Sequence, residues 1–296
     1  MRVHLVDGTF ELFRAHYGKR PGHTGPDGRD LKATVGVVAS LVALLDDPEE
    51  QATHLAVAFD NPIESFRNEL FAGYKTGAGM EPALVAQMDA VEDAVRALGV
   101  TVWSMDRHEA DDALATGARR FRDHDGVDQV RIMTPDKDLG QCLVGQRVVQ
   151  VDRIRRTTID EAALRERRGV APGSIPDYLA LVGDSADGIP GLPGFGEKAA
   201  GALLGCYGHL EAIPADADAW AVKVRGAARL AQTLAERMDD VLLYRRLATL
   251  VDDVPLREGL DELRWRGAPR EAYLAWCDRV GSRTMRDRPS RWCKDG

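Results

Sequence analysis

"QVRIMTPDKD", at residues 129–138, joins a run of apolar and β-branched residues to two aspartates, Asp136 and Asp138. A short apolar run before a turn signal indicates a buried strand. Four other runs have this character, at residues 3–7, 54–60, 100–103 and 147–152. Between the runs, apolar residues at helical spacing predict helices over residues 31–45, 83–98 and 109–122. The alternation predicts an α/β fold class, with a mostly parallel sheet flanked by helices.

Aspartates stand at the ends of three predicted strands, namely Asp7, Asp60 and Asp136. Aspartate is common in turns, so a single one carries little information. The carboxyl ends of parallel strands converge at one edge of the sheet, and ligand sites lie outside that edge. Three strand-end aspartates, followed by the D-x-D pair of Asp136 and Asp138, therefore predict an acidic site there.

A further group of acids begins a predicted helix, where "HEADDALATG" (108–117) crowds Glu109, Asp111 and Asp112 together. The structural alternative is that they favour the helix N-terminus through its dipole, while the other acids form turns. Taken together, the nine carboxylates at predicted loops or element ends predict a metal centre instead, and they are Asp7, Asp60, Glu109, Asp111, Asp112, Asp136, Asp138, Asp184 and Asp187.

Such a group must bind protons or metal, because two carboxylates about 4 Å apart repel each other by roughly 4 kcal/mol at an effective dielectric constant of about 20. Oxygen ligands without His or Cys predict a hard divalent cation, Mg2+ first with Mn2+ as a substitute. The size of the set predicts two or more ions, which can activate water and stabilise the leaving oxygen of a phosphodiester. Asp111 is expected to be a shared ligand, and Glu109 or Asp112 to act partly through bound water.

The composition limits the class of protein. A net charge of −8 argues against a nucleic-acid partner unless the acids are gathered at metal ions, which reverse the local field. No apolar run has the roughly 18–20 residues of a membrane helix and no signal peptide begins the chain, so we expect a cytoplasmic protein without a membrane partner. The four cysteines are scattered without a C-x-x-C pair, which indicates neither a zinc site nor a disulfide framework.

Beyond residue 170 the pattern changes to helices punctuated by glycine and proline. We predict a catalytic domain over residues 1–170, a helical subdomain over 171–250 and a tail over 251–296 that packs back on the core. A strand pattern returns only at "ATLVDDVPL" (248–256). In the Arg- and Trp-rich tail, Trp265 and Trp276 are expected to be packing residues rather than nucleic-acid contacts.

Five segments in this order resemble the successive signatures of the 5′ nucleases, which are the flap endonucleases and the amino-terminal nuclease domain of bacterial DNA polymerase I: "VDGTFELFR", "FDNPIESFRNELFAGYK", "HEADDALA", "TPDKDLGQCL" and "LVGDSADGIPGLPGFGEKAAGALL". The resemblance implies a PIN-like nuclease core with a helix-hairpin-helix (H3TH) subdomain, and it places the family's acidic ligands on the nine carboxylates. It also places Arg67, Tyr74 and Lys75 near the scissile phosphate. There Lys75 could neutralise charge in the transition state and Tyr74 could stack on a terminal base.

The glycine-rich segment before residue 205 has two interpretations. Gly194-x-Gly196-x-x-Ala199 is a weak dinucleotide-loop pattern, but no predicted strand precedes it. The better account is a helix-hairpin-helix, which grips a duplex phosphate without reading sequence, and in the family this turn also holds K+. The DNA-binding residues would be Gly191, Gly194, Gly196 and Lys198.

Two departures from the family pattern affect DNA binding. After "GYK" the apolar stretch "TGAGMEPALV" (76–85) replaces a basic, proline-rich one, and Pro193 stands where lysine is frequent. Fewer phosphate contacts predict lower affinity and a shallower salt dependence.

The expected function is that of a structure-specific, divalent-metal-dependent 5′ nuclease, a 5′-3′ exonuclease or flap endonuclease. It would hydrolyse DNA phosphodiesters at 5′ ends, flaps or gaps by a two-metal mechanism. The resemblance implies a stand-alone, nucleoid-associated monomer that is linked to a DNA polymerase and a ligase. The alternatives are a PIN-class ribonuclease or RNase H-like removal of RNA primers from RNA–DNA hybrids, and a non-catalytic DNA-junction binder. The acidic set opposes a binder, and the hairpin segment opposes a PIN ribonuclease.

Overall fold

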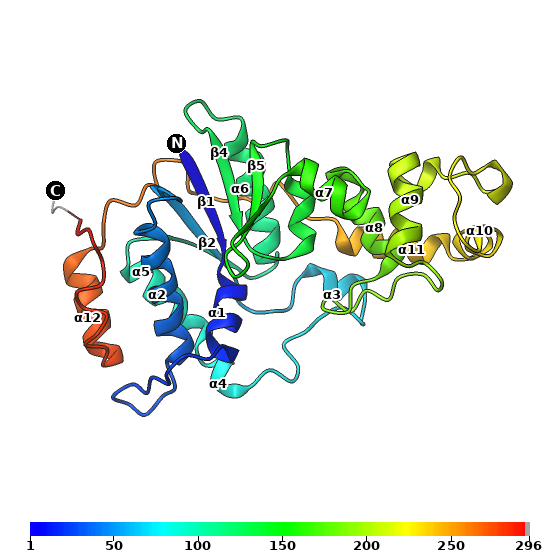
Figure 1. Cartoon of the computed structure of the whole chain (residues 1–296). Helices are drawn as coiled ribbons and strands as arrows, with labels where there is room; N and C mark the ends of the chain where they lie inside the picture. Colours follow the sequence, from blue (N-terminus) through cyan, green and yellow to red (C-terminus); the bar gives the residue numbers. More distant parts are fainter. Residues whose placement is uncertain (294–296) are drawn as a thin grey trace. The chain divides into compact units, whose positions relative to one another are not determined.

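Figure 1 shows the chain as a computed structural model, which describes residues 1–293. The chain forms two compact units. Unit 1 comprises Met1–Glu64, Gly77–Thr134 and the residues from Asp252 on, and unit 2 comprises Ser65–Thr76 and Pro135–Val251. Among residues 1–293, none of the helices has the length and apolar composition that a membrane span requires.

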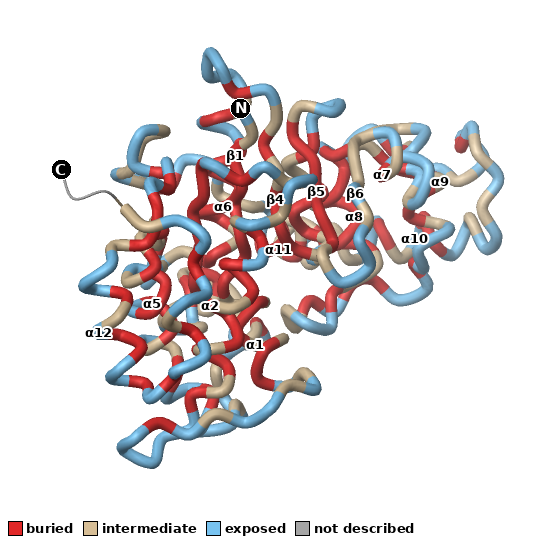
Figure 2. Tube along the Cα trace, turned by 60° about the vertical axis from the view of Figure 1, so that its left-hand side comes forward, coloured by how far each residue is buried: buried red, intermediate tan, exposed pale blue. Residues whose placement is uncertain are grey.

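Unit 1 is built on four parallel strands in the order β3-β2-β1-β4, and their bounds are Arg2–Asp7 (β1), His54–Asp60 (β2), Thr101–Met105 (β3) and Gln129–Met133 (β4). β1 and β2 are buried along almost their whole length, as in sheets covered on both faces, and Figure 2 draws β1 mostly in red. The predicted parallel sheet is confirmed. β4 is shorter than predicted, because it ends at Met133, before Asp136.

The helices of unit 1 lie in two layers. Helices α1 (Gly8–Tyr17), α2 (Lys32–Leu45) and α5 (Met88–Ala97) lie between β1 and β3 in the chain, and α6 (Ala110–Arg122) connects β3 to β4. The strand order changes direction after β3, so right-handed crossovers put α6 on the face opposite to the other three helices, in agreement with Figure 1. The switch point, where such folds bind ligands, lies between the carboxyl ends of β1 and β4.

One predicted helix of unit 1 is interrupted. Residues 83–98 form α4 (Pro82–Val85) and α5 rather than one continuous helix. The side chain of Gln87, between the two, accepts hydrogen bonds at Oε1 from the main-chain N–H groups of Ala33 and Thr34 at 3.1 and 3.0 Å. These bonds satisfy N–H groups at the start of α2 that have no partner within the helix.

The chain from Asp252 returns to unit 1. Leu55 donates its main-chain N–H to the carbonyl of Leu263 at 2.8 Å, and α12 (Arg270–Val280) packs on α5. Trp265 and Trp276 are 7% and 1% exposed, so their predicted packing role is confirmed. The strand predicted at residues 248–256 is wrong, because Val254 donates its N–H to Thr116 Oγ1 at 3.0 Å instead of to a neighbouring strand.

Unit 2 contains an antiparallel pair, β5 (Val148–Asp152) and β6 (Thr157–Ile159), of which only β5 was predicted. Residues 171–250, all of which the structure describes, contain helices and no strand, as predicted. The core lies mainly between α8, α9 and α11 and includes Leu179, Leu203 and Val241. The α-helices of this unit are α3 (Phe66–Leu70), α7 (Glu161–Arg168), α8 (Ile175–Val182), α9 (Glu197–Tyr207), α10 (Ala227–Glu236) and α11 (Met238–Ala248).

Candidate functional site

Asp7 ends β1 and caps α1 in unit 1. Its Oδ1 accepts a hydrogen bond from the main-chain N–H of Phe10 at 2.8 Å. Its Oδ2 accepts one from the hydroxyl of Thr134, directly after β4, at 2.9 Å. The carboxylate is therefore held at the switch point between β1 and β4, where the strand order predicts a ligand site.

Asp60 ends β2, the next strand of unit 1. Its Oδ1 accepts a hydrogen bond from the main-chain N–H of Ala110, the first residue of α6, at 2.7 Å. Its own main-chain N–H donates to Thr9 Oγ1 at 2.8 Å. Unit 1 therefore brings Asp60 beside the start of α6, which carries the Glu109, Asp111 and Asp112 triplet.

Two acids of the triplet form a capping box at the start of α6. The main-chain N–H of Glu109 donates to Asp112 Oδ2 at 3.0 Å, and the Glu109 side chain accepts from the main-chain N–H of Asp112. Both side chains are buried, whereas Asp111 is half-buried. Helix capping is thus observed for two of the three acids. It does not exclude metal binding, because a carboxylate offers about four lone-pair sites and a cap uses only one or two.

In unit 2 three acids converge. Carboxylate oxygens of Asp138, Asp184 and Asp187 all lie within 4.8 Å of one another. The fourth predicted acid, Asp136, precedes them and accepts a hydrogen bond at Oδ1 from the main-chain N–H of Asp138 at 2.9 Å. The D-x-D pair of the sequence is therefore a turn that presents Asp138 to the two acids of the loop after α8.

The loop that carries Asp184 and Asp187 is closed by main-chain hydrogen bonds. Asp184 and Ile189 exchange N–H···O bonds of 2.8 and 2.7 Å. Gly188 has a φ of +74°, and a Cβ there would lie 2.1 Å from the carbonyl oxygen of Gly73, so only glycine fits. The main-chain N–H of Lys75 donates to the Asp187 carbonyl at 3.0 Å, which fixes Lys75 beside the cluster.

The charges of this cluster are only partly balanced. Lys137 Nζ lies 2.6 Å from Asp184 Oδ2, and Lys75 Nζ lies 3.0 Å from Asp187 Oδ1. Burial, and then the negative charges of Asp136, Asp187 and Asp184, raise the pKa of Asp138 well above its usual range. Burial lowers the pKa of Lys137, but its hydrogen bond to Asp184 and the surrounding acids outweigh this and raise it.

Asp138 also provides the test of whether a metal ion fits. It is 4% exposed, and its Oδ1 has no hydrogen-bond partner among the described residues. A buried oxygen without a donor is costly, and like charges nearby increase the cost. A divalent cation would remove both penalties, and a donor set of carboxylate oxygens alone fits a hard ion. The residues of unit 2 therefore fit the predicted metal.

The three residues predicted near the scissile phosphate differ in their environment. Lys75 is partly exposed and paired with Asp187. Tyr74 is only 4% exposed and belongs to the core of unit 2, so stacking on a base would require it to present a face that is buried in this structure. Arg67 is 1% exposed and donates through Nε and Nη2 to the carbonyls of Leu247 and Thr249, at 2.8 and 3.0 Å. In this arrangement Arg67 closes the C-terminal end of α11.

The predicted hairpin lies between α8 and α9. Gly191 and Gly194 have φ values of +70° and +88°, and a Cβ on Gly191 would lie 2.5 Å from the main-chain nitrogen of Gly183. Gly196 is the N-cap residue of α9, and Lys198 is exposed in its first turn. No strand occurs among residues 183–195, all of them described, so the dinucleotide-loop interpretation is wrong.

Sequence reasoning missed three side chains that hold the acids. Lys137 was visible inside the D-x-D motif, but its pairing with Asp184 depends on a loop almost fifty residues away. Thr9 and Thr134 stand two residues after Asp7 and one residue after β4, and both bond to strand-end aspartates. A hydroxyl residue next to a predicted strand-end acid is the signal that could have found the two threonines.

Comparisons with known proteins cover almost the whole chain. Residues 2–169 match the family model described as 5′-3′ exonuclease, N-terminal resolvase-like domain, and residues 170–271 match that described as 5′-3′ exonuclease, C-terminal SAM fold. DNA polymerase I of Mycobacterium leprae is 34% identical over 289 residues, which cover 96% of this chain and 31% of that protein. DNA polymerase I of Pseudomonas aeruginosa is 38% identical over 275 residues, which cover 92% of this chain and 29% of that protein. The chain thus spans about a third of the length of these relatives.

Solved structures share the fold at low sequence identity. T5 5′-exonuclease with bound divalent metal ions (zinc) has a TM-score of 0.66 at 17% identity, over 95% of this chain and 100% of that one. The catalytic core of Rad2 in complex with a DNA substrate has a TM-score of 0.57 at 12% identity, over 95% and 87%. The expected fold class, an α/β nuclease core with a helical domain, is therefore confirmed.

Proposed function

Because the chain belongs to the 5′-3′ exonuclease family, we propose that it is a divalent-metal-dependent hydrolase that cleaves DNA phosphodiesters at 5′ ends, flaps or gaps. The observation that carries the proposal is the cluster of Asp138, Asp184 and Asp187, in which a buried carboxylate oxygen lacks a hydrogen-bond donor. A site of this kind has a clear chemical use in phosphodiester hydrolysis and no evident structural one.

Asp138, Asp184 and Asp187 would hold a divalent ion, with Mg2+ preferred and Mn2+ a substitute. Bound there, the ion would supply Lewis acidity and lower the pKa of a coordinated water. The other predicted acids are proposed as ligands of two or more ions in total, and they are Asp7, Asp60, Glu109, Asp111, Asp112 and Asp136.

The basic groups have separate tasks in this proposal. Lys75, beside Asp187, places a cation where negative charge develops on a phosphate as it is attacked. Lys137 holds Asp184 in position through their ion pair. At the hairpin, the glycine amides and Lys198 bind a phosphate of the duplex arm and K+ occupies the turn, so that DNA is gripped without reading its sequence.

The finer parts of the proposal concern the setting of the enzyme. We propose the predicted domains at residues 1–170, 171–250 and 251–296, and a monomer that works at the nucleoid beside a DNA polymerase and a ligase. The similarity to the DNA polymerase I proteins supports the link to DNA synthesis. Size-exclusion chromatography with light scattering would test the monomer.

The function is tested with a DNA duplex that carries a 5′-labelled single-stranded flap. With Mg2+ we expect cleavage, with EDTA none, and the length of the labelled product distinguishes release of single nucleotides from release of the whole flap. Asp138→Asn and Asp184→Asn should each reduce cleavage by at least about a hundredfold. Asp239→Asn, at an exposed position of α11, is the matched control and should cleave like the wild type.

Two results would contradict the proposal. One is the absence of a Mg2+-dependent product, which would favour a non-catalytic junction binder. The other is undiminished cleavage by Asp138→Asn, which would remove the metal site. An RNA flap of the same sequence, cleaved faster than the DNA flap, would favour the ribonuclease alternative.

A further inference from the structure

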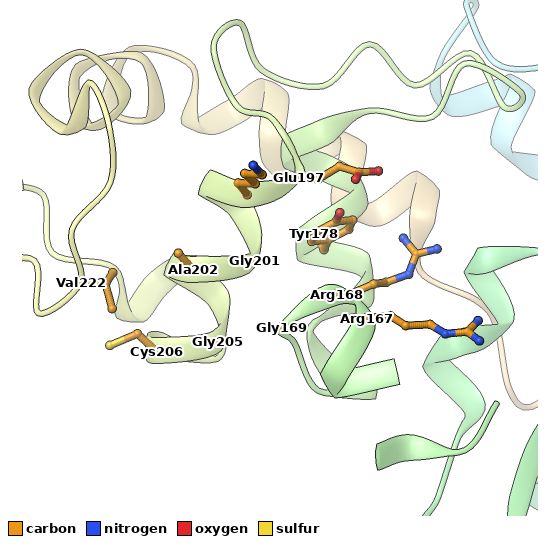
Figure 3. Close-up of a pocket in the computed structure, with 11 residues that line it drawn as sticks. Arg167, Arg168, Gly169, Tyr178, Glu197, Gly201, Ala202, Gly205, Cys206 and Val222 are labelled. Carbon is orange, nitrogen blue, oxygen red and sulfur yellow. The ribbon is translucent and has the colours of Figure 1, made fainter. Parts of the chain in front are cut away.

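A groove of about 1020 Å³ lies in unit 2 between the end of α7 and the side of α9 (Figure 3). Arg167 and Arg168 stand on one side of it, and Cys206 and Val222 on the other. Lys198, at the start of α9, also lines it. Of these residues, the function proposed above uses only Lys198.

Glycines allow the two helices to come this close. A Cβ on Gly201 would lie 2.6 Å from the carbonyl oxygen of Arg168, and a Cβ on Gly205 would lie 2.4 Å from that of Gly169. Gly169 itself ends α7 with a φ of +74°. The last turn of α7 therefore rests directly on the backbone of α9, and this contact fixes the position of Arg167 and Arg168 at the rim.

Basic side chains continue from the groove in both directions. A neighbouring hollow shares Arg167 and Arg168 and adds Lys137 and Arg155, and another shares Lys198 and adds Lys223 and Arg225. We call this row of Arg155, Arg167, Arg168, Lys198, Lys223 and Arg225 the basic track. It begins beside Lys137, whose Nζ lies 2.6 Å from Asp184 of the candidate metal cluster.

Acids of unit 2 balance the charge of the basic track only in part. Glu197 also lines the groove, but within the part of the chain that the structure describes it lies within 4.0 Å of no basic group. Arg155 pairs with Asp152, and the guanidinium of Arg168 lies 5.6 Å from the centre of the Tyr178 ring. Among the described residues, Arg167 and Lys198 have no acidic partner within 4.0 Å, and the same holds for Lys223 and Arg225. The chain has a net charge of −8, yet these basic residues are gathered on one surface. This separation of charge indicates an anionic ligand.

We propose that the basic track binds consecutive phosphates along the duplex arm of the substrate, and that Arg167 and Arg168 extend the phosphate contacts beyond the hairpin. This inference rests on the proposed function. A favourable interaction with the α7 dipole would account for arginines in the last turn of that helix. It would not account for Lys198, Lys223 and Arg225, which lie on α9 and the segment after it.

A matched pair of variants tests the track through salt dependence. Arg167→Gln and Arg165→Gln each remove one exposed arginine from the end of α7, but Arg165 pairs with Glu161 and lies outside the groove. Duplex binding is measured by fluorescence anisotropy in EDTA over a range of salt concentrations. For each lost phosphate contact, the slope of log K against log salt should become shallower by about 0.9. We expect this, with about 3- to 10-fold weaker binding, for Arg167→Gln and not for Arg165→Gln.

Cys206 gives a second readout on the unmodified protein. Its thiol is exposed and lines the groove. Its alkylation by N-ethylmaleimide, followed by mass spectrometry of the peptide, should slow at least about fivefold when duplex DNA is bound, while alkylation of Cys293, on the tail, should not change. Equal protection by a single strand of the same length would overturn the assignment to the duplex arm.

Cleavage of the flap substrate by the wild type, measured in parallel, separates the two proposals. Mg2+-dependent cleavage together with unchanged salt slopes and an unprotected Cys206 would overturn the basic track and leave the nuclease function standing. Cys206 protection and a shallower slope without cleavage would keep a DNA-binding track and overturn the nuclease function. Neither cleavage nor duplex binding would overturn both.

Discussion

At the scale of single residues, the acids of unit 2 differ in how their charge is compensated. Asp184 and Asp187 each face a lysine, whereas Oδ1 of Asp138 is buried without a hydrogen-bond partner. Part of the binding site is therefore maintained at the expense of the stability of the metal-free fold. This is the usual compromise where a site is arranged for a ligand rather than for the empty protein.

The raised pKa of Asp138 predicts a pH dependence of stability in EDTA. The unfolded chain releases this proton near the ordinary carboxyl value of 3.8, whereas the folded chain keeps it to higher pH. Between the two values folding takes up a proton, so the free energy of unfolding falls as the pH rises above about 4. Asp138→Asn should remove this fall and melt a few degrees higher than the wild type at pH 7.

Thermal melts from pH 4 to pH 8 in EDTA, with Asp239→Asn as the exposed control, test this prediction. The gap in melting temperature between the wild type and Asp138→Asn should widen as the pH rises. If it does not, ionisation of the Asp138 carboxyl does not destabilise the folded protein. Ten millimolar Mg2+ should reverse the order, because only the wild type retains the charged ligand.

Thr134 is predicted to position the Asp7 carboxylate. Its hydroxyl donates to Asp7 Oδ2 at 2.9 Å and both groups are buried. Thr134→Val keeps the shape and removes the donor, which should cost about 1 kcal/mol of stability and raise the Mg2+ concentration needed for half-maximal cleavage about 3- to 10-fold. Thr134→Ser, which restores the hydroxyl, should restore the Mg2+ midpoint. A midpoint unchanged in Thr134→Val would show that Asp7 needs no such support.

At the scale of elements, the N-terminus of α6 collects carboxylates for two reasons at once. Asp60 accepts from the N–H of Ala110, and Glu109 and Asp112 form the capping box. The positive end of the helix dipole lowers the cost of placing three acids together. Capping and metal binding are therefore compatible explanations of the same residues, and a substitution can separate them.

Asp112→Asn is that substitution. The amide oxygen can still accept from the N–H of Glu109, as Oδ2 does at 3.0 Å, but the charge is lost. We expect Asp112→Ala to cost on the order of 1–2 kcal/mol and Asp112→Asn less than half of this, because only the alanine loses the cap. Both should lower cleavage at least about tenfold if the residue also serves a metal ion. Chemical denaturation and cleavage assays on the two variants distinguish the capping role of Asp112 from its metal-binding role. A fully active Asp112→Asn would show that Asp112 is a capping residue only.

The elements that the sequence predicted well are those whose pattern is local. β1 and β2 are almost continuously buried runs because both of their faces are covered, and α2 and α6 have apolar residues at helical spacing. Helix α1 was missed because Asp7, the acid that caps it, was interpreted as the end of a strand, and it is both. The single helix predicted over residues 83–98 failed at Gln87, whose partners are on α2.

The candidate site shows where prediction from sequence stops. The positions of the acids follow from strand ends and motifs, but their local partners do not. Arg67 bonds to carbonyls 180 and 182 residues away, and burial of its guanidinium cannot be inferred from "ESFRNEL". Likewise, the local pattern around Tyr74 and Lys75 does not indicate that the first is buried and the second partly exposed. Long-range contacts set these properties.

At the scale of the whole molecule, the excess of acidic over basic residues reflects carboxylates that are gathered where cations are expected to bind. Asp138, Asp184 and Asp187 of unit 2 form a cluster, and the basic track of the same unit begins beside Lys137, which pairs with Asp184. Net charge therefore says little about the partner, because charge of each sign is concentrated where a ligand of the other sign is expected. Ions that bind the folded state alone also stabilise it by mass action.

Mg2+ should accordingly stabilise the metal-free protein, by about 2.7 kcal/mol when its concentration is a hundred times its dissociation constant. In hydrogen exchange, the slowing by Mg2+ should be confined to the segments that hold the ion, since a bound ion slows the opening of those segments. Amides of residues 136–142 and 183–189 should exchange more slowly with Mg2+ than with EDTA, whereas those of α12 serve as the internal reference and should not change. The double variant Asp138→Asn/Asp184→Asn should show neither effect. Equal slowing in α12 would mean that the ion acts by screening the net charge of −8 rather than by binding this cluster. Slower exchange of residues 136–142 and 183–189 that persists in the double variant would mean that Asp138 and Asp184 do not hold the ion.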